Sequence, residues 1–545
     1  MASTPDVPRE GGEKSEKPPS EDNSEYPGNS QRIAVMGALF LTIFVVNLDT
    51  NIIATAIPRI TDDFHSLADY GWYGSAYLLT ICAFQLIMGK LYKLFPAKAL
   101  FLACSALFEL GSLLCGAAPN SIAFIFGRAI AGVGTAGIFS GAMVIMVHTI
   151  PLQQRPIYQA LFGATFAVAS VIGPLLGGAF TDHVTWRWCF YINLPIGAVS
   201  MAVTFWLVQL KNQELEPWAS GWLPKVLQLD PVGNLVFIPA IVCLILALQW
   251  GGAQYAWQDA HVVVALVFAG VLLAAFVATQ IWRQEKATVP PRIAKQRSIA
   301  ASLFFTFFNG SAMMLALYYL PLWFQAVQGV SATNSGIRLL PVILPTILGS
   351  LVSGVIISKV GYCNPFFYLS SILMPIGAGL LATMTPDSGM AEWFGYQVIL
   401  GIGIGVGSQQ PMTIAQTVLP KIDVGIGTSL VMFARFLGPT IFLPVGQNIF
   451  LSALVENVRN LPNIDAETII DGGATELRNL VSEQDLPTLL SDYNAALTHV
   501  YYLIAALSAI TIIGSFFVEW KSVRSPAAQE GPMASKSSDK GSGEA

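Results

Sequence analysis

Three ionisable side chains stand inside long apolar runs of the sequence, where a charge is costly. Arg128 lies near the start of FGRAIAGVGTAGIFSGAMVIMVH (residues 126–148), Asp49 follows the run LFLTIFVVNL, and Glu109 lies within ALFELGSLLCG. An arginine keeps its proton at ordinary pH, so it acts on protons only by changing the proton affinity of a nearby acid. The chemistry open to this set is reversible proton binding by a carboxyl group beside an arginine.

Either acid could be the partner of Arg128. Asp49 lies in the polar cluster NLDTN near the predicted outer end of its apolar run, and we favour it. Glu109 is kept as a second proton carrier, because it lies near the middle of its run. Plainer interpretations are a helix end at the membrane interface for Asp49 and a neutral packing residue for Glu109.

Arg128 itself has two interpretations. On insertion scales an arginine at the centre of a membrane helix costs about 2.5–3.5 kcal/mol, and a position nearer the interface costs less. Arg128 falls in the outer half of its run, so it could be an interfacial anchor. We favour a side chain that faces a central polar cavity, with Gly132 and Thr135 on the same helical face leaving it room.

The elements that position these residues are apolar runs of about 20 residues, the length of helix that crosses the hydrocarbon core of a bilayer. Of the 545 residues, 54% are hydrophobic and 11% charged, against about 25% charged in a soluble protein. This predicts an all-α, multi-pass protein whose surroundings are a lipid bilayer, and the net charge of −5 argues against a nucleic-acid partner. We predict fourteen spans, at residues 33–56, 73–94, 99–118, 121–147, 157–180, 190–210, 231–250, 261–282, 300–325, 336–358, 365–384, 393–419, 424–446 and 499–519.

The distribution of lysine and arginine predicts the orientation of these spans. An even number of spans puts both termini on one side, and most basic loop residues fall on that side, whereas the short opposite loops hold little beyond Arg59 and Arg187. By the positive-inside rule both termini are cytoplasmic, and the acidic segment 447–498 is extracellular. The polar tails 1–31 and 521–545 are predicted to be disordered.

Short motifs repeat along the chain at a constant offset. GKLYKLFPAK (89–98) corresponds to GVIISKVGYCNPF (354–366), and GPLLGG (173–178) to LGPTIFLPVG (437–446), each about 265 residues apart. Such duplication is typical of transporters. It predicts an N-terminal six-helix bundle at 32–210, a linker with two inserted helices at 211–299 and a C-terminal six-helix bundle at 300–520.

Several stretches resemble motifs of the major facilitator superfamily. FGRAIAGVGTAG resembles its arginine motif in the fourth helix, and ASVIGPLLGGAF resembles its antiporter motif in the fifth. NLDTNIIATAIPRI and TDHVTWRWCFYINLPIG resemble stretches of the fourteen-span drug:proton antiporters. SAYLLTICAFQLIMGKLY and FELGSLLCGAAPNS are similar to fungal members that export toxins and secondary metabolites.

The resemblance implies the major facilitator fold and a role for Arg128 in coupling proton movement to substrate movement. One motif departs from the family pattern, which normally has an aspartate four residues after Gly89. Lys93 occupies that place here, and Ser358 occupies it in the second half. An acidic charge relay at the inner gate is therefore not carried over, although Gly89 still permits a tight helix end.

Small residues lie on one helical face of the fifth span. They follow one another at spacings of three and four residues: Gly163, Ala167, Ser170, Pro174 and Gly177. Small faces let membrane helices approach closely, and Pro174 beside Gly173 is expected to bend the helix. We expect this motif, which ends at Gly178, to slide or seal during alternating access.

The C-terminal half is expected to supply much of the substrate surface, because its spans combine aromatic and polar side chains that suit amphipathic organic molecules. The candidate contacts are Phe308, Asn309, Gln325, Gln409, Gln410 and Arg435. The aromatic residues of the ninth span could equally face lipid or pack inside the bundle.

The sequence shows no enzyme motif. Its five histidines have no metal-ligand spacing, and it has no GxxxxGKS or GxxxxGKT loop for nucleotide phosphates. We therefore expect no metal and no cofactor, and a proton gradient as the energy source. With the resemblance, this predicts a monomeric proton antiporter that exports a toxin, secondary metabolite or drug across the plasma membrane, or across a vacuolar or vesicle membrane. The alternatives are an importer of a siderophore or nutrient with the same fold, and a non-transporting membrane sensor.

Overall fold

The computed structural model describes residues 27–65, 70–210, 213, 215, 227–251, 255–458 and 485–524. Within these ranges, fourteen helical segments are long and apolar enough to cross a membrane, which confirms the predicted all-α, multi-pass fold. Most of both predicted tails lies outside the described residues, as do positions 459–484 of the predicted extracellular segment.

The first six spans form an N-terminal bundle. Two of its helices begin at a capping or a proline residue: the side chain of Asn120 accepts a hydrogen bond from the amide of Ala123 at 2.9 Å, and Pro96 directly precedes the third helix. The helices are α1 (Asn29–Phe64), α2 (Tyr70–Leu94), α3 (Ala97–Ala117), α4 (Ser121–Thr149), α5 (Arg155–His183), α6 (Trp188–Tyr191) and α7 (Asn193–Leu207), with the 3-10 turn η3 (Leu152–Gln154) before α5.

The last six spans form a C-terminal bundle on the same plan. Gly361 ends one of its helices in a left-handed conformation, with φ of 95°, which glycine adopts without steric cost. The helices are α12 (Arg297–Ala326), α13 (Ala332–Ile337), α14 (Leu340–Val360), α15 (Asn364–Leu381), α16 (Met390–Ser408), α17 (Gln410–Val418), α18 (Val424–Val458) and α20 (Leu486–Phe517), with the 3-10 turn η5 (Lys421–Asp423) before α18.

Two further spans are inserted between the bundles. They are α9 (Pro231–Trp250) and α10 (Ala260–Arg283), followed by η4 (Gln284–Lys286) and α11 (Pro291–Ala294). α9 packs against both α2 and α18, and the ring of Phe237 lies 5.5 Å from that of Phe433. The buried carboxylate of Asp230 joins the start of α9 to the end of α10. It accepts a hydrogen bond from the amide of Thr288 at 2.8 Å and lies 3.3 Å from Arg283.

The observed helices differ from the predicted spans in two main respects. The twelfth is broken at Gln409 into α16 and α17, because Pro411 has no N–H to continue the hydrogen bonding of the preceding turn. α18 and α20 also extend into the segment 447–498, which was predicted to be an extracellular loop. The two extensions pack against each other, since the rings of Phe450 and Tyr493 lie 5.1 Å apart between them.

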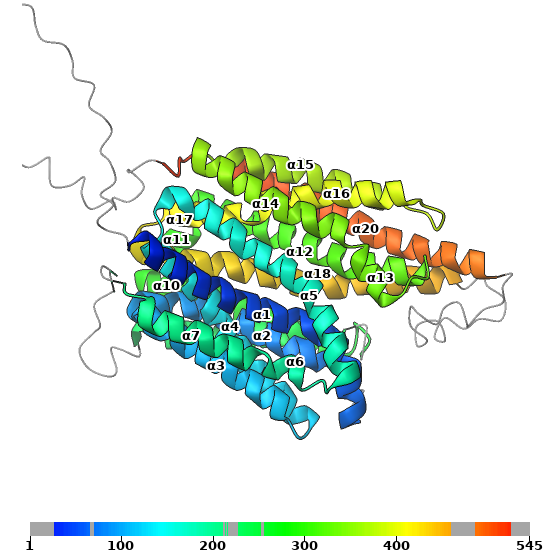
Figure 1. Ribbon diagram of the computed structural model, residues 1–545, viewed down its shortest axis with the longest axis horizontal. Coiled ribbons are helices and arrows are strands. Elements are labelled where there is room, and N and C mark those ends of the chain that lie inside the picture. The colour runs from blue at the N-terminus through cyan, green and yellow to red at the C-terminus, as the bar shows by residue number, and fades with distance from the viewer. Residues whose placement is uncertain are drawn as a thin grey trace, which may run out of the picture.

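The spans run along the long axis of the molecule (Figure 1). α1 begins and α20 ends at the same end, on the left of the view, as an even number of crossings requires. We call this the tail end of the molecule.

The bundles meet along two seams that the internal repeat relates to each other. α2 packs against α18, and α5 packs against α14. A Cβ atom on Gly89 would lie 2.7 Å from the hydroxyl oxygen of Ser429, and one on Gly354 would lie 2.7 Å from the carbonyl oxygen of Pro156. Each half therefore presents the glycine of its repeated motif to the other half.

Inside each bundle another glycine sets a tight helix crossing. A Cβ atom on Gly111 of α3 would lie 2.7 Å from the Cα of Ala131 on α4, and one on Gly377 of α15 would lie 2.6 Å from the amide nitrogen of Leu400 on α16. Backbone atoms cannot move aside as a flexible side chain can, so these two crossings leave no room for a methyl group.

We expect Gly111→Ala and Gly377→Ala each to destabilise the protein by about 1–3 kcal/mol through overpacking. Thermal unfolding of the detergent-solubilised protein measures the effect. Gly270→Ala is the matched control, because nothing lies within 4 Å of a Cβ atom at that position. Equal melting temperatures in all three variants would contradict the tight crossings.

Candidate functional site

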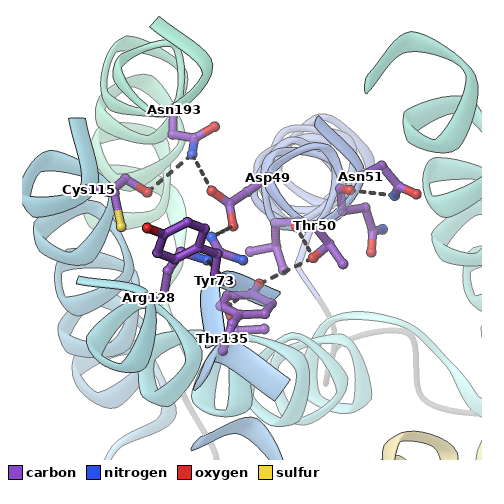
Figure 2. Close-up of polar contacts among 12 residues, drawn as sticks. Asp49, Thr50, Asn51, Tyr73, Cys115, Arg128, Thr135 and Asn193 are labelled. Carbon is purple, nitrogen blue, oxygen red and sulfur yellow. Dashed lines mark hydrogen bonds and ion pairs between the residues drawn. The ribbon is translucent and has the colours of Figure 1, made fainter. Parts of the chain in front are cut away.

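A buried ion pair joins α1 to α4. Arg128 Nη1 lies 2.6 Å from Asp49 Oδ2, and the two side chains are 1% and 0% exposed. Figure 2 shows the guanidinium directed at the carboxylate. Removing two ions from water costs several kcal/mol for each, so such a pair persists only where its geometry is good and its other donors and acceptors are bonded.

Neighbouring helices supply the remaining partners of this pair. Arg128 Nε donates to the backbone carbonyl of Tyr73 at 3.1 Å, and the guanidinium lies over the ring of Tyr77, 4.2 Å from its centroid. The side-chain amide of Asn193, at the start of α7, donates to the other oxygen of Asp49 at 3.1 Å. The pair therefore connects α1, α2, α4 and α7 (Figure 2).

The sequence of α4 explains why α2 can come so close. A Cβ atom on Gly132 would collide with the carbonyl oxygen of Tyr77. Nearly one turn further along, the hydroxyl of Thr135 lies 2.8 Å from the hydroxyl of Tyr77 and holds that ring beneath the guanidinium. The small face that we expected to leave room for Arg128 instead brings a second helix against it.

The burial of the pair bears on the interpretations of its two residues. An interfacial anchor would leave Arg128 exposed near a helix end, which is not what the structure shows. We expected this side chain to face a cavity between the two bundles. It instead points into the interior of the N-terminal bundle and is not among the residues that line that cavity, which is described below. Asp49 is fully buried as well, and of the two candidate acids it is the one that contacts Arg128.

Glu109 lies apart from the ion pair, on the side of α3 that faces α7. Its Oε1 occupies the space that a Cβ atom on Gly197 would need, and its Oε2 is buried without a hydrogen-bond partner among the described residues. Burial without a partner penalises the charged form of a carboxyl group. The placement suits the neutral packing residue that the sequence allowed.

A narrow cavity lies between the bundles along the α5–α14 seam. α5 supplies its N-terminal wall, and α12, α14, α16 and α18 supply its C-terminal wall together with Gln409. In this conformation it has room for little more than a water molecule. Of the six predicted substrate contacts, Gln409 and Arg435 line it.

The other four predicted substrate contacts lie elsewhere in the C-terminal bundle. Gln410 donates to a serine hydroxyl of α14 at 3.2 Å, and Asn309 donates to a methionine sulfur of α15 at 3.0 Å. Phe308 packs among three other phenylalanine rings of α12 and α18. Gln325 is half-buried near the end of α12 that is remote from the tail end.

The small residues of α5 divide between two neighbours. Those that line the cavity are Gly163, Ala167 and Ser170. Gly173 packs against α1 instead, where a Cβ atom would lie 2.9 Å from the Cβ of Asn51. Pro174 is exposed and the helix continues through it, while the carbonyls of Gly177 and Gly178 accept from a threonine hydroxyl at 2.9 Å.

A three-residue charge cluster joins the bundles at the tail end. Lys93 Nζ lies 3.3 Å from Asp423 Oδ1, and Arg292 Nη2 lies 2.7 Å from Asp423 Oδ2. Lys93 belongs to α2, Asp423 to the turn before α18, and Arg292 to α11 of the inserted segment. At the place where the family motif has an acid, this chain therefore has a base on the N-terminal half that pairs with an acid on the C-terminal half.

Ser358 makes the repeat-related contact at the same end. Its hydroxyl donates to the backbone carbonyl of Gln153, in the turn before α5. Two further side-chain contacts close this region, Ser140 with Ser429 at 2.9 Å and Thr413 with Gln159 at 2.6 Å. The structure therefore has its bundles joined at the tail end.

Sequence reasoning did not single out Asn193, Tyr77 or Asp423. Asn193 stands in FYINLPIG, part of a stretch that resembles a family motif, so that motif was the available signal. Asp423 stands in a short loop, and no local pattern relates it to Lys93 on a distant helix.

These features define a class of protein, a membrane protein of two duplicated helical bundles that close around a shared cavity, as secondary transporters do. The family model of the Major Facilitator Superfamily matches residues 39–443. The chain belongs to the major facilitator superfamily, as its motifs indicated.

Curated relatives match over nearly their whole length. The chain is 50% identical over 491 residues to "MFS-type efflux pump MFS1" of Arthroderma benhamiae, covering 90% of this chain and 91% of the relative. It is 48% identical over 491 residues to "Efflux pump roqT" of Penicillium rubens, covering 90% of each. It is 46% identical over 508 residues to "Efflux pump aflT" of Aspergillus parasiticus, covering 93% and 98%.

Solved structures show the same fold at low sequence identity. The proton:xylose symporter XylE superposes with a TM-score of 0.56 at 12% identity, covering 91% of this chain and 98% of that one. A bacterial homologue of the lysosomal transporter Spinster gives a TM-score of 0.54 at 16% identity, covering 93% and 100%. These likenesses support the arrangement of helices described above.

Removing one member of the ion pair leaves the other charge buried alone. We expect Arg128→Leu and Asp49→Leu each to destabilise the protein by about 3–5 kcal/mol, and the double variant to lose much less. Thermal unfolding of the purified protein in detergent compares the three. Additive losses in the double variant would show that the two residues do not compensate each other.

Reversing one charge of the tail-end cluster should loosen that end, because like charges then face each other. We expect Lys93→Asp and Asp423→Lys each to increase labelling of a cysteine introduced at Ser429 in a cysteine-free background. The double exchange should reverse this only in part, because it restores the pair with α2 but sets Arg292 against a lysine. Lys295→Asp, at an exposed position of the same end, is the control. Unchanged labelling in both single variants would contradict a gating role for the cluster.

Proposed function

We propose that the protein is a secondary active exporter that exchanges protons for small amphipathic organic molecules. Relatives that are 46–50% identical over nine-tenths of the chain are named efflux pumps, which supports export over import or sensing. The Asp49–Arg128 pair is the observation that carries the proton coupling, because it places one carboxylate against one guanidinium in a site closed to water.

Protonation of Asp49 would change the balance of this site. The neutral acid no longer compensates Arg128, whose other contacts are a carbonyl oxygen and aromatic rings. A buried cation without a counterion is strongly destabilised, so the helices that hold it rearrange until the charge finds water or another partner. Release of the proton restores the pair and the arrangement seen here.

Two contacts connect the pair to the cavity wall. Asn47, two residues before Asp49, donates to the hydroxyl of Thr165 on α5 at 3.2 Å, and Asn51, two residues after it, packs on Gly173 of the same helix. α5 also presents three small residues to the cavity. A movement of α1 that follows protonation of Asp49 therefore moves the N-terminal wall of the cavity.

The driving force is adequate for this work. A proton that enters down a membrane potential releases about 2.3 kcal/mol per 100 mV, before any contribution from the pH difference. For a neutral cargo and an exchange ratio of one, that energy supports a concentration ratio of about fifty. We further propose a monomer in the plasma membrane with cytoplasmic termini. The basic residues at the tail end support the orientation of the termini.

Asp49→Asn removes the proton carrier and keeps a hydrogen-bonding side chain of the same size. We expect export by this variant to become independent of the pH gradient. We expect Arg128→Ala to abolish export when efflux is normalised to the amount of folded protein at the membrane. The measurement is dye efflux from cells or proteoliposomes with an imposed pH gradient, with and without a protonophore.

Glu109→Gln is the matched comparison for that experiment. It removes an acid from a neighbouring helix without touching Arg128, and we expect it to keep its pH dependence. Loss of coupling in Glu109→Gln with retention in Asp49→Asn would move the proton to Glu109. Wild-type efflux that a protonophore leaves unchanged would rule out proton coupling altogether.

A further inference from the structure

Arg435 is a cation in the cavity wall that the protein compensates only weakly. Its Nη1 donates to the backbone carbonyl of Ser408 at 3.4 Å, a long hydrogen bond. A guanidinium has five N–H donors, and no acidic side chain is found among the described residues that line this cavity. Most of its bonding capacity is therefore open toward the cavity.

Arg435 is half-buried, whereas two arginines of the described chain are nearly fully buried and have stronger partners. Arg128 has a carboxylate at 2.6 Å, and Arg155 donates to two backbone carbonyls at 2.9 and 2.8 Å. The protein thus supplies these two buried guanidinium groups with a carboxylate or with backbone carbonyls. Arg435 is the exception, and it is the one of the three that lines the space between the bundles.

The position of Arg435 is set by its surroundings. Its backbone packs on Gly310 of α12, where a Cβ atom would lie 3.2 Å from the Arg435 carbonyl oxygen. The guanidinium reaches the break between α16 and α17, where the carbonyl end of α16 carries partial negative charge. That end orients the side chain but provides no full counter-charge.

We propose that the cavity binds organic anions, with a carboxylate or another acidic group of the cargo paired to Arg435. The inference rests on the proposed export function and specifies the cargo of that same site. A planar guanidinium pairs with a carboxylate through two parallel hydrogen bonds, which supplies geometry as well as charge. The cargo completes the ion pair that the protein leaves open.

The rest of the wall suits the body of such a molecule. Apolar side chains form most of it: Phe166, Met313, Leu317, Val342, Ile343 and Ile404. Ser170 and Gln409 stand among them as hydrogen-bonding groups on opposite walls. Because the two bundles contribute facing walls, the narrow space widens as they part, and an aromatic or aliphatic acid fits its chemistry better than a cation or a sugar.

An anionic cargo also changes the electrical behaviour of the exchange. Outward movement of an anion and inward movement of a proton transfer charge in the same electrical sense, so both are driven by an interior-negative potential. When the cargo is neutral, the membrane potential contributes free energy only through the movement of the proton. Export of an acid should therefore depend more steeply on membrane potential than export of its neutral analogue.

The test compares aromatic acids with their own primary amides. Naphthoic, anthracenecarboxylic and biphenylcarboxylic acids and their amides are loaded into yeast cells that express the full chain, and efflux is measured against cells that lack it. We expect Arg435→Gln to lower efflux of the acids about tenfold relative to the amides, the usual loss for a charged hydrogen bond. Arg435→Lys should keep much of the preference, and Lys286→Gln, an exposed control, should keep all of it.

The outcomes separate this inference from the export function. A preference for acids that disappears in Arg435→Gln supports it, and efflux of the amides shows that the variant still folds. Equal efflux of acids and amides by the wild type, or a preference that survives in Arg435→Gln, overturns the inference and leaves export standing. No efflux of any pair by wild-type protein present at the membrane counts against the export function, and the inference falls with it.

Discussion

A hydrocarbon core offers no hydrogen bonds, so every charge placed in it must find its partner inside the protein. The Asp49–Arg128 pair is how this chain meets that constraint in its N-terminal bundle, and the surrounding contacts follow from it. Gly132 brings α2 close, Tyr77 lies beneath the guanidinium, and Asn193 brings α7 to the carboxylate. Four helices therefore depend on a charge that a single proton can remove.

Two other polar sites between the bundles differ in how fully their charges are paired. At the tail end, Asp423 receives one base from each of two other parts of the chain, and this joins both bundles to the inserted helices. In the cavity wall, the hydrogen-bond partner of Arg435 among the described residues is a backbone carbonyl. The complete site joins parts of the chain, whereas the incomplete one is the basis of the proposed binding of an anionic cargo.

Much of this fold could be predicted from local pattern. Apolar run length gave the fourteen spans, and the constant offset of two motifs indicated the duplication that the α2–α18 and α5–α14 seams display. Local pattern did not predict the helical extensions around Phe450 and Tyr493, which contact each other across a long stretch of sequence. It also placed Arg128 toward the cavity, because helical periodicity shows which residues share a face but not which helix that face meets.

The sequence by itself determined that the chain is a duplicated membrane protein with a few charges in its spans, since hydropathy and repetition are properties of neighbouring residues. Only the tertiary structure decided which charge meets which. Asp49 reaches Arg128, Lys93 reaches Asp423, and Arg435 reaches no acid among the described residues that line its cavity. Pairing depends on how helices that are distant in the chain cross each other. Glycines allow these close crossings, but the sequence does not show which helix will pack against each glycine.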